Sequence, residues 1–218
     1  MYIIITGINS VSKRLVKDLM KNDDVVVVEE DDSKAERIYS DLGVEVVKGA
    51  PTNISVLEDA GISKADVLVT TLEDDNRNMV ISMLGQKYGV PDVVTRVENS
   101  EYRDIYNMLE VNTIEYNDIV FSEFLSVIKH PAIRKIANIG KDKEILQITV
   151  TENSEFNDLR IDEIKSIDDF PDQKVGFSGI LREGEIFQAN DTVRLETDDS
   201  LVLIAEQDAK EDVNKVLD

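Results

Sequence analysis

Apolar strands and amphipathic helices alternate along the chain from residue 2 to about residue 117. Short runs rich in valine, isoleucine and threonine predict strands at residues 2–6, 25–29, 45–48, 66–70, 92–97 and 113–116. Apolar residues at helical spacing predict helices near residues 10–21, 33–42, 53–60, 75–88 and 99–110. Such alternation is typical of a parallel sheet covered on both faces. We therefore predict an α/β fold, a Rossmann-like doubly wound parallel sheet, over residues 1–117.

A helical pattern begins near Asp118 and continues until Pro131 interrupts it. Ile133 and Ile136 then resume apolar spacing beyond the proline. This pattern predicts a linker or crossover helix over residues 118–139, either kinked at the proline or split into two helices. Its apolar surface must pack against its own domain or against a second copy of the chain.

The pattern changes again after Gly140, where short strands predominate. Strands are predicted at residues 144–150, 175–182, 185–188 and 200–205, with helices near residues 160–167 and 209–217. The turn Arg182-Glu183-Gly184-Glu185 suits a hairpin between the two middle strands. We therefore predict a second, smaller α+β domain over residues 140–218.

The first strand and helix open like a dinucleotide-binding unit. The usual fingerprint, G-x-G-x-x-G, uses its glycines for a tight turn, for the approach of a pyrophosphate and for close packing of helix on strand. Gly7 keeps the first position, whereas Asn9 and Ser12 occupy the other two. Asn9 puts a side chain where phosphate would approach, and Ser12 is small enough to preserve the packing. The crevice at the carboxyl ends of the first and fourth strands is the expected ligand site.

Two charged residues stand at the ends of strands near this crevice. Glu29 follows Gly7 at about the 20-residue spacing of the acidic group that holds a ribose hydroxyl in nucleotide-binding folds. It would also disfavour a phosphorylated ribose, because two negative charges would meet. Glu29 is equally well explained as an acidic residue at the end of a strand in a very acidic protein. Arg96 could pair with a phosphate or with one of the many carboxylates of the chain.

Composition narrows the classes of function. The chain has 45 acidic and 24 basic residues and a net charge of −21, which makes nucleic acid a poor partner. It contains no cysteine and a single histidine, His130, so disulfides, thiolate catalysis and familiar zinc sites are excluded. No metal site and no catalytic residues are predicted. The sequence also lacks a signal peptide or an apolar run of the ~18 residues that span a membrane, which predicts a cytoplasmic protein.

Several further segments carry a family resemblance. One reads Gly49-Ala50-Pro51-Thr52, and another joins the strand at residues 67–71 to a polar turn and an asparagine-bearing helix. Residues 94–102, the hairpin at residues 180–184 and the closing segment at residues 191–204 extend the match over nearly the whole chain. Together they resemble the TrkA-type potassium-transport regulators, in which an RCK N-terminal or KTN domain precedes an RCK C-terminal domain. The family pattern is G-D-A-T where this chain has Ala50, so one acidic pocket residue is missing.

The resemblance implies a nucleotide site in the first domain. The residues that match the family's site, or stand at the ends of its strands, are Gly7, Ile8, Asn9, Ser10, Val11, Glu29, Thr52, Thr70, Thr71 and Arg96. Thr52 can equally cap the helix that follows it. Because the fingerprint is altered, three hypotheses stay open: an intact NAD site, a site for a smaller or differently placed adenine nucleotide, and an empty structural pocket.

The resemblance also implies a regulatory subunit rather than an enzyme. Such proteins form homodimers and often rings beneath a membrane-embedded potassium transporter or channel, and bound nucleotide changes the shape of the ring. That partner would hold a cytoplasmic chain at the inner face of the membrane. Two other functions stay open: an NAD-dependent oxidoreductase, and a scaffold with a degenerate nucleotide site whose C-terminal domain senses a small ligand such as a cyclic dinucleotide.

Overall fold

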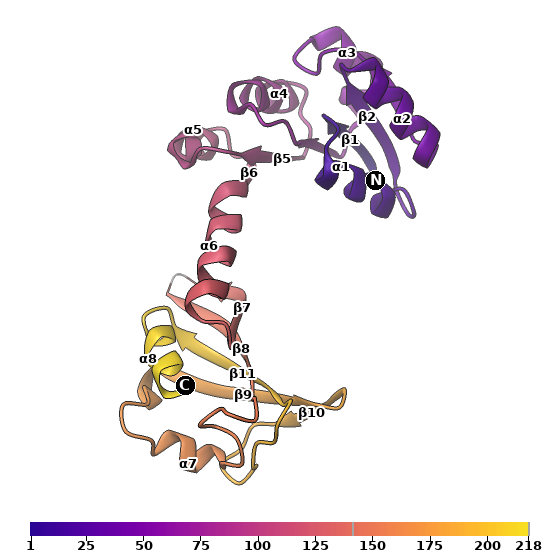
Figure 1. The fold of residues 1–218 in the computed structure, drawn as a ribbon. Helices are drawn as coiled ribbons and strands as arrows, with labels where there is room; N and C mark the ends of the chain where they lie inside the picture. The colour runs from indigo at the N-terminus through magenta and orange to yellow at the C-terminus, as the bar shows by residue number, and fades with distance from the viewer. Residues whose placement is uncertain (141, 218) are drawn as a thin grey trace. The chain divides into compact units, whose positions relative to one another are not determined.

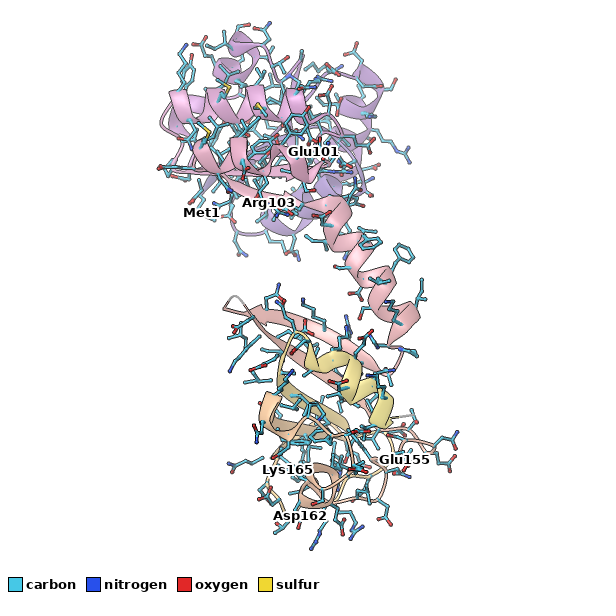
Figure 2. The ribbon with its side chains drawn as sticks, turned by 90° about the vertical axis from the view of Figure 1, so that its left-hand side faces the viewer. Met1, Glu101, Arg103, Glu155, Asp162 and Lys165 are labelled. Atoms are coloured by element: carbon cyan, nitrogen blue, oxygen red, sulfur yellow. The ribbon has the colours of Figure 1, made fainter. Side chains whose placement is uncertain are left out.

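The computed structural model describes residues 1–140 and 142–217. These residues divide into two compact units, Met1–Val120 and Phe121–Asp218, which we call the N-terminal and C-terminal units (Figure 1). Each unit has its own buried apolar residues. Figure 2 shows the side chains of both units. Among the described residues, no helix has the length and apolar character needed to cross a bilayer.

A six-stranded parallel sheet forms the centre of the N-terminal unit, in the order β3-β2-β1-β4-β5-β6. Its strands are β1 (Tyr2–Thr6), β2 (Asp24–Glu29), β3 (Glu45–Lys48), β4 (Val67–Thr70), β5 (Asp92–Val97) and β6 (Asn112–Glu115). Its helices are α1 (Ser10–Leu19), α2 (Asp32–Leu42), α3 (Ile54–Asp59), α4 (Asp75–Lys87) and α5 (Arg103–Met108), with 3-10 turns η1 (Ile62–Lys64) and η2 (Ser100–Tyr102). The predicted doubly wound fold is confirmed.

The central strand β1 shows why this sequence forms a sheet buried on both faces. Successive side chains of a strand point to opposite faces. Ile3 and Ile5 pack in the core beneath α1 and α2, whereas Ile4 packs in the core beneath α3, α4 and α5. All three are at most 2% exposed, so a continuous apolar run suits both layers of helices.

The C-terminal unit contains a five-stranded antiparallel sheet in the order β10-β9-β11-β8-β7. Its strands are β7 (Ile133–Ile139), β8 (Lys143–Thr149), β9 (Val175–Arg182), β10 (Glu185–Gln188) and β11 (Ser200–Glu206). The helices α7 (Ile161–Lys165) and α8 (Ala209–Leu217) and the 3-10 turn η3 (Asp172–Lys174) complete it. Glu183 and Gly184 have φ of +50° and +84°, the left-handed pair that a two-residue hairpin turn requires.

The predicted linker helix is wrong beyond Lys129. Helix α6 (Tyr116–Lys129), which contains the boundary between the units, ends there. Residues 133–139 form the strand β7, paired antiparallel with β8, so the smaller domain starts before residue 140. The register shifts between Lys135 and Ala137, and this bulge disturbs the period-2 alternation of the strand. The apolar spacing that results resembles that of a helix.

We expect the two cores to respond separately to mutation. Ile148 is fully buried in the C-terminal core, and Ile148→Ala should lower the free energy of unfolding by about 2–5 kcal/mol, through lost burial and the cavity left behind. Hydrogen exchange should then accelerate in the C-terminal unit and stay unchanged in the N-terminal unit. Ile186→Ala is the matched control, because Ile186 is 85% exposed. Equal acceleration in both units would show that the cores are not independent.

A buried tyrosine gives the N-terminal unit a sensitivity to alkaline pH. The Tyr106 hydroxyl donates to the carbonyl oxygen of Asp75 at 3.0 Å, and burial raises the pKa of Tyr106 to about 12. An unfolded tyrosine ionises near pH 10, at about its reference pKa. The stability that Tyr106 contributes is therefore complete below that pH and is lost as the pH rises toward 12.

The variant Tyr106→Phe should remove this contribution to the pH dependence. Wild-type stability should fall by up to about 1.4 kcal/mol per pH unit more steeply than that of the variant above pH ~10. Titration of phenolate absorbance should show Tyr106 ionising last among the six tyrosines of the wild type, after Tyr88, whose pKa is also raised by its hydrogen bond to Glu58. If the latest ionisation step persists in Tyr106→Phe, another tyrosine is responsible for that step.

Candidate functional site

A pocket of about 340 Å³ lies at the carboxyl ends of β1, β2 and β4, where the strand order changes direction. In open α/β sheets this switch point is the usual place for a ligand. We call it the crevice pocket; its lining residues are Gly7, Ile8, Asn9, Glu29, Glu30, Lys34, Thr71, Leu72, Glu73, Asp74 and Arg77. The structure thus brings five of the predicted site residues together: Gly7, Ile8, Asn9, Glu29 and Thr71.

Gly7 makes the tight turn after β1, as the fingerprint predicts. Its φ is +82°, a conformation that other residues rarely adopt. A Cβ atom at this position would also lie 2.5 Å from Cδ2 of Leu72 in the loop after β4. The left-handed backbone conformation therefore favours a glycine here, and any side chain would also have to displace the end of Leu72.

Asn9 caps helix α1 with its own side chain. Its Oδ1 accepts hydrogen bonds from the backbone N–H groups of Val11 and Ser12, at 2.9 and 3.0 Å. Its Nδ2 donates to the carbonyl oxygen of Thr71 at 2.7 Å. Free N–H groups at the start of a helix are what bind phosphate in Rossmann folds. The carboxamide of Asn9 therefore occupies the position in which a pyrophosphate would be held.

Ser12 completes the cap and keeps the helix close to the sheet. It is fully buried, as expected for the third fingerprint position. Its Oγ accepts from the backbone N–H of Asn9 at 2.8 Å, so the two residues form a reciprocal capping box. The two glycine replacements therefore act as one unit that closes the start of α1.

Glu29 joins two of the loops that surround the crevice pocket. Its side chain is 4% exposed, and its two carboxylate oxygens accept from the backbone N–H groups of Ile8 and Asp31 at 2.7 and 2.9 Å. Glu29 is thus more than an acidic strand end, because it fixes the loop after β1 to the loop after β2. A carboxylate oxygen has more than one lone pair, so a ribose hydroxyl can still be accepted.

An ion pair between Glu30 and Arg77 connects the loop after β2 with α4. The two guanidinium nitrogens of Arg77 donate to the two carboxylate oxygens of Glu30 at 2.8 and 2.7 Å. This contact lowers the pKa of Glu30 and raises that of Arg77. Sequence reasoning did not include Arg77. Its place in the first turn of a helix that directly follows β4 was the available signal.

The remaining predicted residues lie outside the lining of the crevice pocket. Ser10 and Val11 begin α1 on its exposed side. Thr70 is buried, with its Oγ1 2.7 Å from Oγ1 of Thr95. Thr52 is half-buried before α3, and Asn53 rather than Thr52 caps that helix.

Of the two roles expected for Arg96, pairing with a phosphate or with a carboxylate, the structure shows the second. It pairs with Glu98, and its guanidinium lies 4.0 Å from the ring centroid of Tyr116. Ala50 is half-buried and does not line the crevice pocket. Neither residue lines the crevice pocket.

The crevice pocket has an excess of negative charge. Four carboxylates, Glu29, Glu30, Glu73 and Asp74, line it beside two cations, Lys34 and Arg77. Nevertheless, the part of the chain that the structure describes contains no group of three or more acidic, histidine or cysteine side chains able to hold a metal ion. The chemistry available is hydrogen bonding by backbone and carboxylate groups, with two cations in the lining.

A doubly wound sheet with a crevice at its switch point, a glycine turn after β1 and a carboxylate at the end of β2 defines a Rossmann-like nucleotide-binding domain. The family model of the TrkA-N domain matches residues 3–117. The chain belongs to the TrkA-N domain family. The resemblance stated from the sequence motifs is thereby confirmed.

Two of the chain's relatives are named as potassium uptake proteins. A Trk system potassium uptake protein TrkA homolog from Archaeoglobus fulgidus is 30% identical, over 85% of this chain and 43% of the relative. A TrkA homolog from Methanothermobacter thermautotrophicus is 23% identical, over 99% of this chain and 98% of the relative. The chain therefore spans less than half of the first relative and nearly all of the second.

Solved structures agree with the fold over both units. The GsuK channel matches 99% of this chain and 39% of its own, with a TM-score of 0.69 and 18% sequence identity. Another structure of the same protein, with the same TM-score, is that of the GsuK channel bound to NAD. At this identity the likeness establishes the fold alone.

Replacing the Glu29 carboxylate should weaken the whole site. In Glu29→Gln, one side-chain oxygen becomes an amide donor that faces a backbone N–H, so one buried hydrogen bond is lost. The free energy of unfolding should fall by about 1–3 kcal/mol, measured by urea denaturation. Glu45→Gln, at an exposed position of β3, is the control and should change stability little. Equal stability of the two variants would refute the structural role of Glu29.

Proposed function

We propose that this chain is a regulatory, gating subunit of a Trk- or Ktr-type potassium uptake system or of a potassium channel. A nucleotide, NAD or an adenine nucleotide, binds in the crevice pocket and changes the state of the assembly. The observation that carries the proposal is the crevice pocket itself, with Gly7 and Glu29 at its base. Family membership, the potassium uptake relatives and the NAD-bound GsuK structure support it.

The three loops at the crevice pocket provide a physical route from ligand to conformation. Asn9 connects the loop after β1 to the loop after β4, and Glu29 connects it to the loop after β2. The Glu30–Arg77 pair adds a third connection, between the β2 loop and α4. A ligand that binds among these loops must exchange some of those contacts for its own. It therefore favours one arrangement of the domain, as differential affinity requires.

The proposed assembly is a homodimer or a ring of such subunits. Helix α6 carries exposed apolar side chains: Phe121 and Phe124 are both 66% exposed, Val127 60% and Ile128 75%. Contiguous exposed apolar residues mark interaction surfaces. A second copy of the chain would cover them, and a membrane-embedded potassium transporter or channel subunit would hold the assembly at the cytoplasmic face.

A second candidate is a scaffold that senses its ligand through the C-terminal unit. The cap formed by Asn9 favours it, because the phosphate position of the first domain is already occupied. The C-terminal unit also has a groove of about 460 Å³ whose lining includes Lys129, Lys135 and Lys210 among acidic residues. An NAD-dependent oxidoreductase is the third possibility, and turnover measurements distinguish it from both.

Thermal shifts of the full chain distinguish these functions. NAD, NADH, ATP, ADP, AMP and cyclic di-AMP should be tested one at a time. If the regulatory proposal is right, NAD or at least one adenine nucleotide should raise the Tm. At a ligand concentration of a hundred times Kd, the gain in the free energy of unfolding should be about 2.7 kcal/mol. A shift with cyclic di-AMP alone would favour the scaffold, and oxidation of NADH with substrate would establish an enzyme.

Potassium uptake by the host cell tests the regulatory role directly. Cells that lack the chain should show altered uptake, and the wild-type chain should restore it. A variant that no longer binds its nucleotide should fail to restore regulation while it remains folded. Normal uptake and regulation without the chain would contradict the proposal.

A further inference from the structure

We propose that the crevice pocket binds a nucleoside monophosphate in preference to a dinucleotide. In this arrangement Asn9 excludes a pyrophosphate from the start of α1, and Arg77 binds the single phosphate. The inference rests on the proposed nucleotide function, since it names the ligand class of the same pocket.

The first step is the exclusion by Asn9. A bound pyrophosphate needs the N–H groups of the first turn of α1, and those of Val11 and Ser12 already donate to Asn9 Oδ1. The side chain cannot rotate away cheaply, because its Nδ2 also donates to the Thr71 carbonyl. A dinucleotide must therefore break three hydrogen bonds before it gains its own contacts at α1.

The second step is the placement of Arg77. Its guanidinium holds the Glu30 carboxylate through two parallel hydrogen bonds, a geometry that also suits phosphate. Arg77 lines the crevice pocket and is 31% exposed, so a ligand phosphate can replace Glu30 as its partner. Lys34, on α2, is the second cation of the lining, and its charge helps to lower the pKa of Glu30. Both cations therefore act on the Glu30 carboxylate that a ligand phosphate would replace.

The third step concerns size and charge. Small-molecule pockets range from about 300 to 1,000 Å³, and the crevice pocket has about 340 Å³, which suits a compact ligand. Charge does not separate the two ligands, because the phosphate monoester of AMP carries a charge of about −1.5 to −2 and the pyrophosphate of NAD carries one negative charge on each phosphate. The small volume of the pocket therefore favours the nucleoside monophosphate.

Isothermal titration of the full chain with AMP, adenosine and NAD tests the proposal. Wild-type protein should bind AMP at least about tenfold more tightly than NAD, a difference of about 1.4 kcal/mol. Asn9→Gly should raise NAD affinity about tenfold or more and leave AMP affinity nearly unchanged, because glycine restores the open fingerprint at a cost of only a few tenths of a kcal/mol in capping.

A second variant tests the phosphate-binding residue. Arg77→Gln should weaken AMP binding by about tenfold or more, the usual size of a lost charge-assisted contact. It should leave the affinity for adenosine, which has no phosphate, unchanged. An equal loss for adenosine would show that Arg77 acts on the fold of the pocket rather than on phosphate, and would overturn its assignment.

Matched controls separate these effects from general loss of stability. Asn53→Gly removes a similar side-chain cap, from α3, where Asn53 accepts from the N–H of Ser55. Arg103→Gln breaks another ion pair between arginine and glutamate, Arg103 with Glu115, neither of which lines the crevice pocket. Arg103 is labelled in Figure 2. Both control variants should bind AMP and NAD like the wild type. Asn9→Ala, which the extended φ of −142° at this position permits, is a second variant that opens the same site, at a larger cost in capping. Circular dichroism checks that each variant folds.

The outcomes distinguish the ligand class from the broader function. NAD binding as tight as AMP binding in the wild type, with no gain in Asn9→Gly, would overturn the inference and leave the nucleotide function intact. Absence of binding of any nucleotide by the wild type and by Asn9→Gly would refute the proposed function itself. A gain of NAD binding in Asn9→Gly alone would still identify Asn9 as the excluding group.

Discussion

The crevice pocket depends on one constraint: backbone polar groups in the loops after three parallel strands need hydrogen-bond partners. In this chain two side chains, Glu29 and Asn9, supply partners to all three loops. Glu29 accepts from two loops at once, and Asn9 closes the first turn of α1 while it donates to a third loop. Buried or half-buried polar groups left without partners would be costly. A ligand that binds these backbone groups must therefore compete with the protein's own side chains.

The fold of the N-terminal unit was predictable because its signals are local. The run Ile3-Ile4-Ile5 is apolar on both faces of a strand, and its neighbours alternate with helical periods. The strand β7 was not predictable by the same reasoning. Its bulge at Lys135 to Ala137 changes the spacing of apolar residues, and only pairing with β8 reveals a strand.

Site residues could be predicted from the sequence where the backbone conformation calls for a particular residue type. Gly7 is required by a positive φ, and Asn9 follows it in the same loop, so both could be placed from the fingerprint. Arg77 could not be placed in the same way, because its partner Glu30 is 47 positions away in the sequence. Arg96 shows the opposite case. A carboxylate two residues further on, Glu98, was available locally and became its partner.

The Glu30–Arg77 ion pair affects how strongly ligand binding in the crevice pocket depends on salt concentration. Dissolved ions screen exposed charges and weaken ion pairs, more so as the concentration rises. A phosphate that takes the place of the Glu30 carboxylate exchanges one partly exposed ion pair for another, so screening weakens both sides of the exchange and largely cancels. The affinity of such a pocket for its ligand therefore changes little with ionic strength. This is a useful property in a protein whose relatives take up potassium.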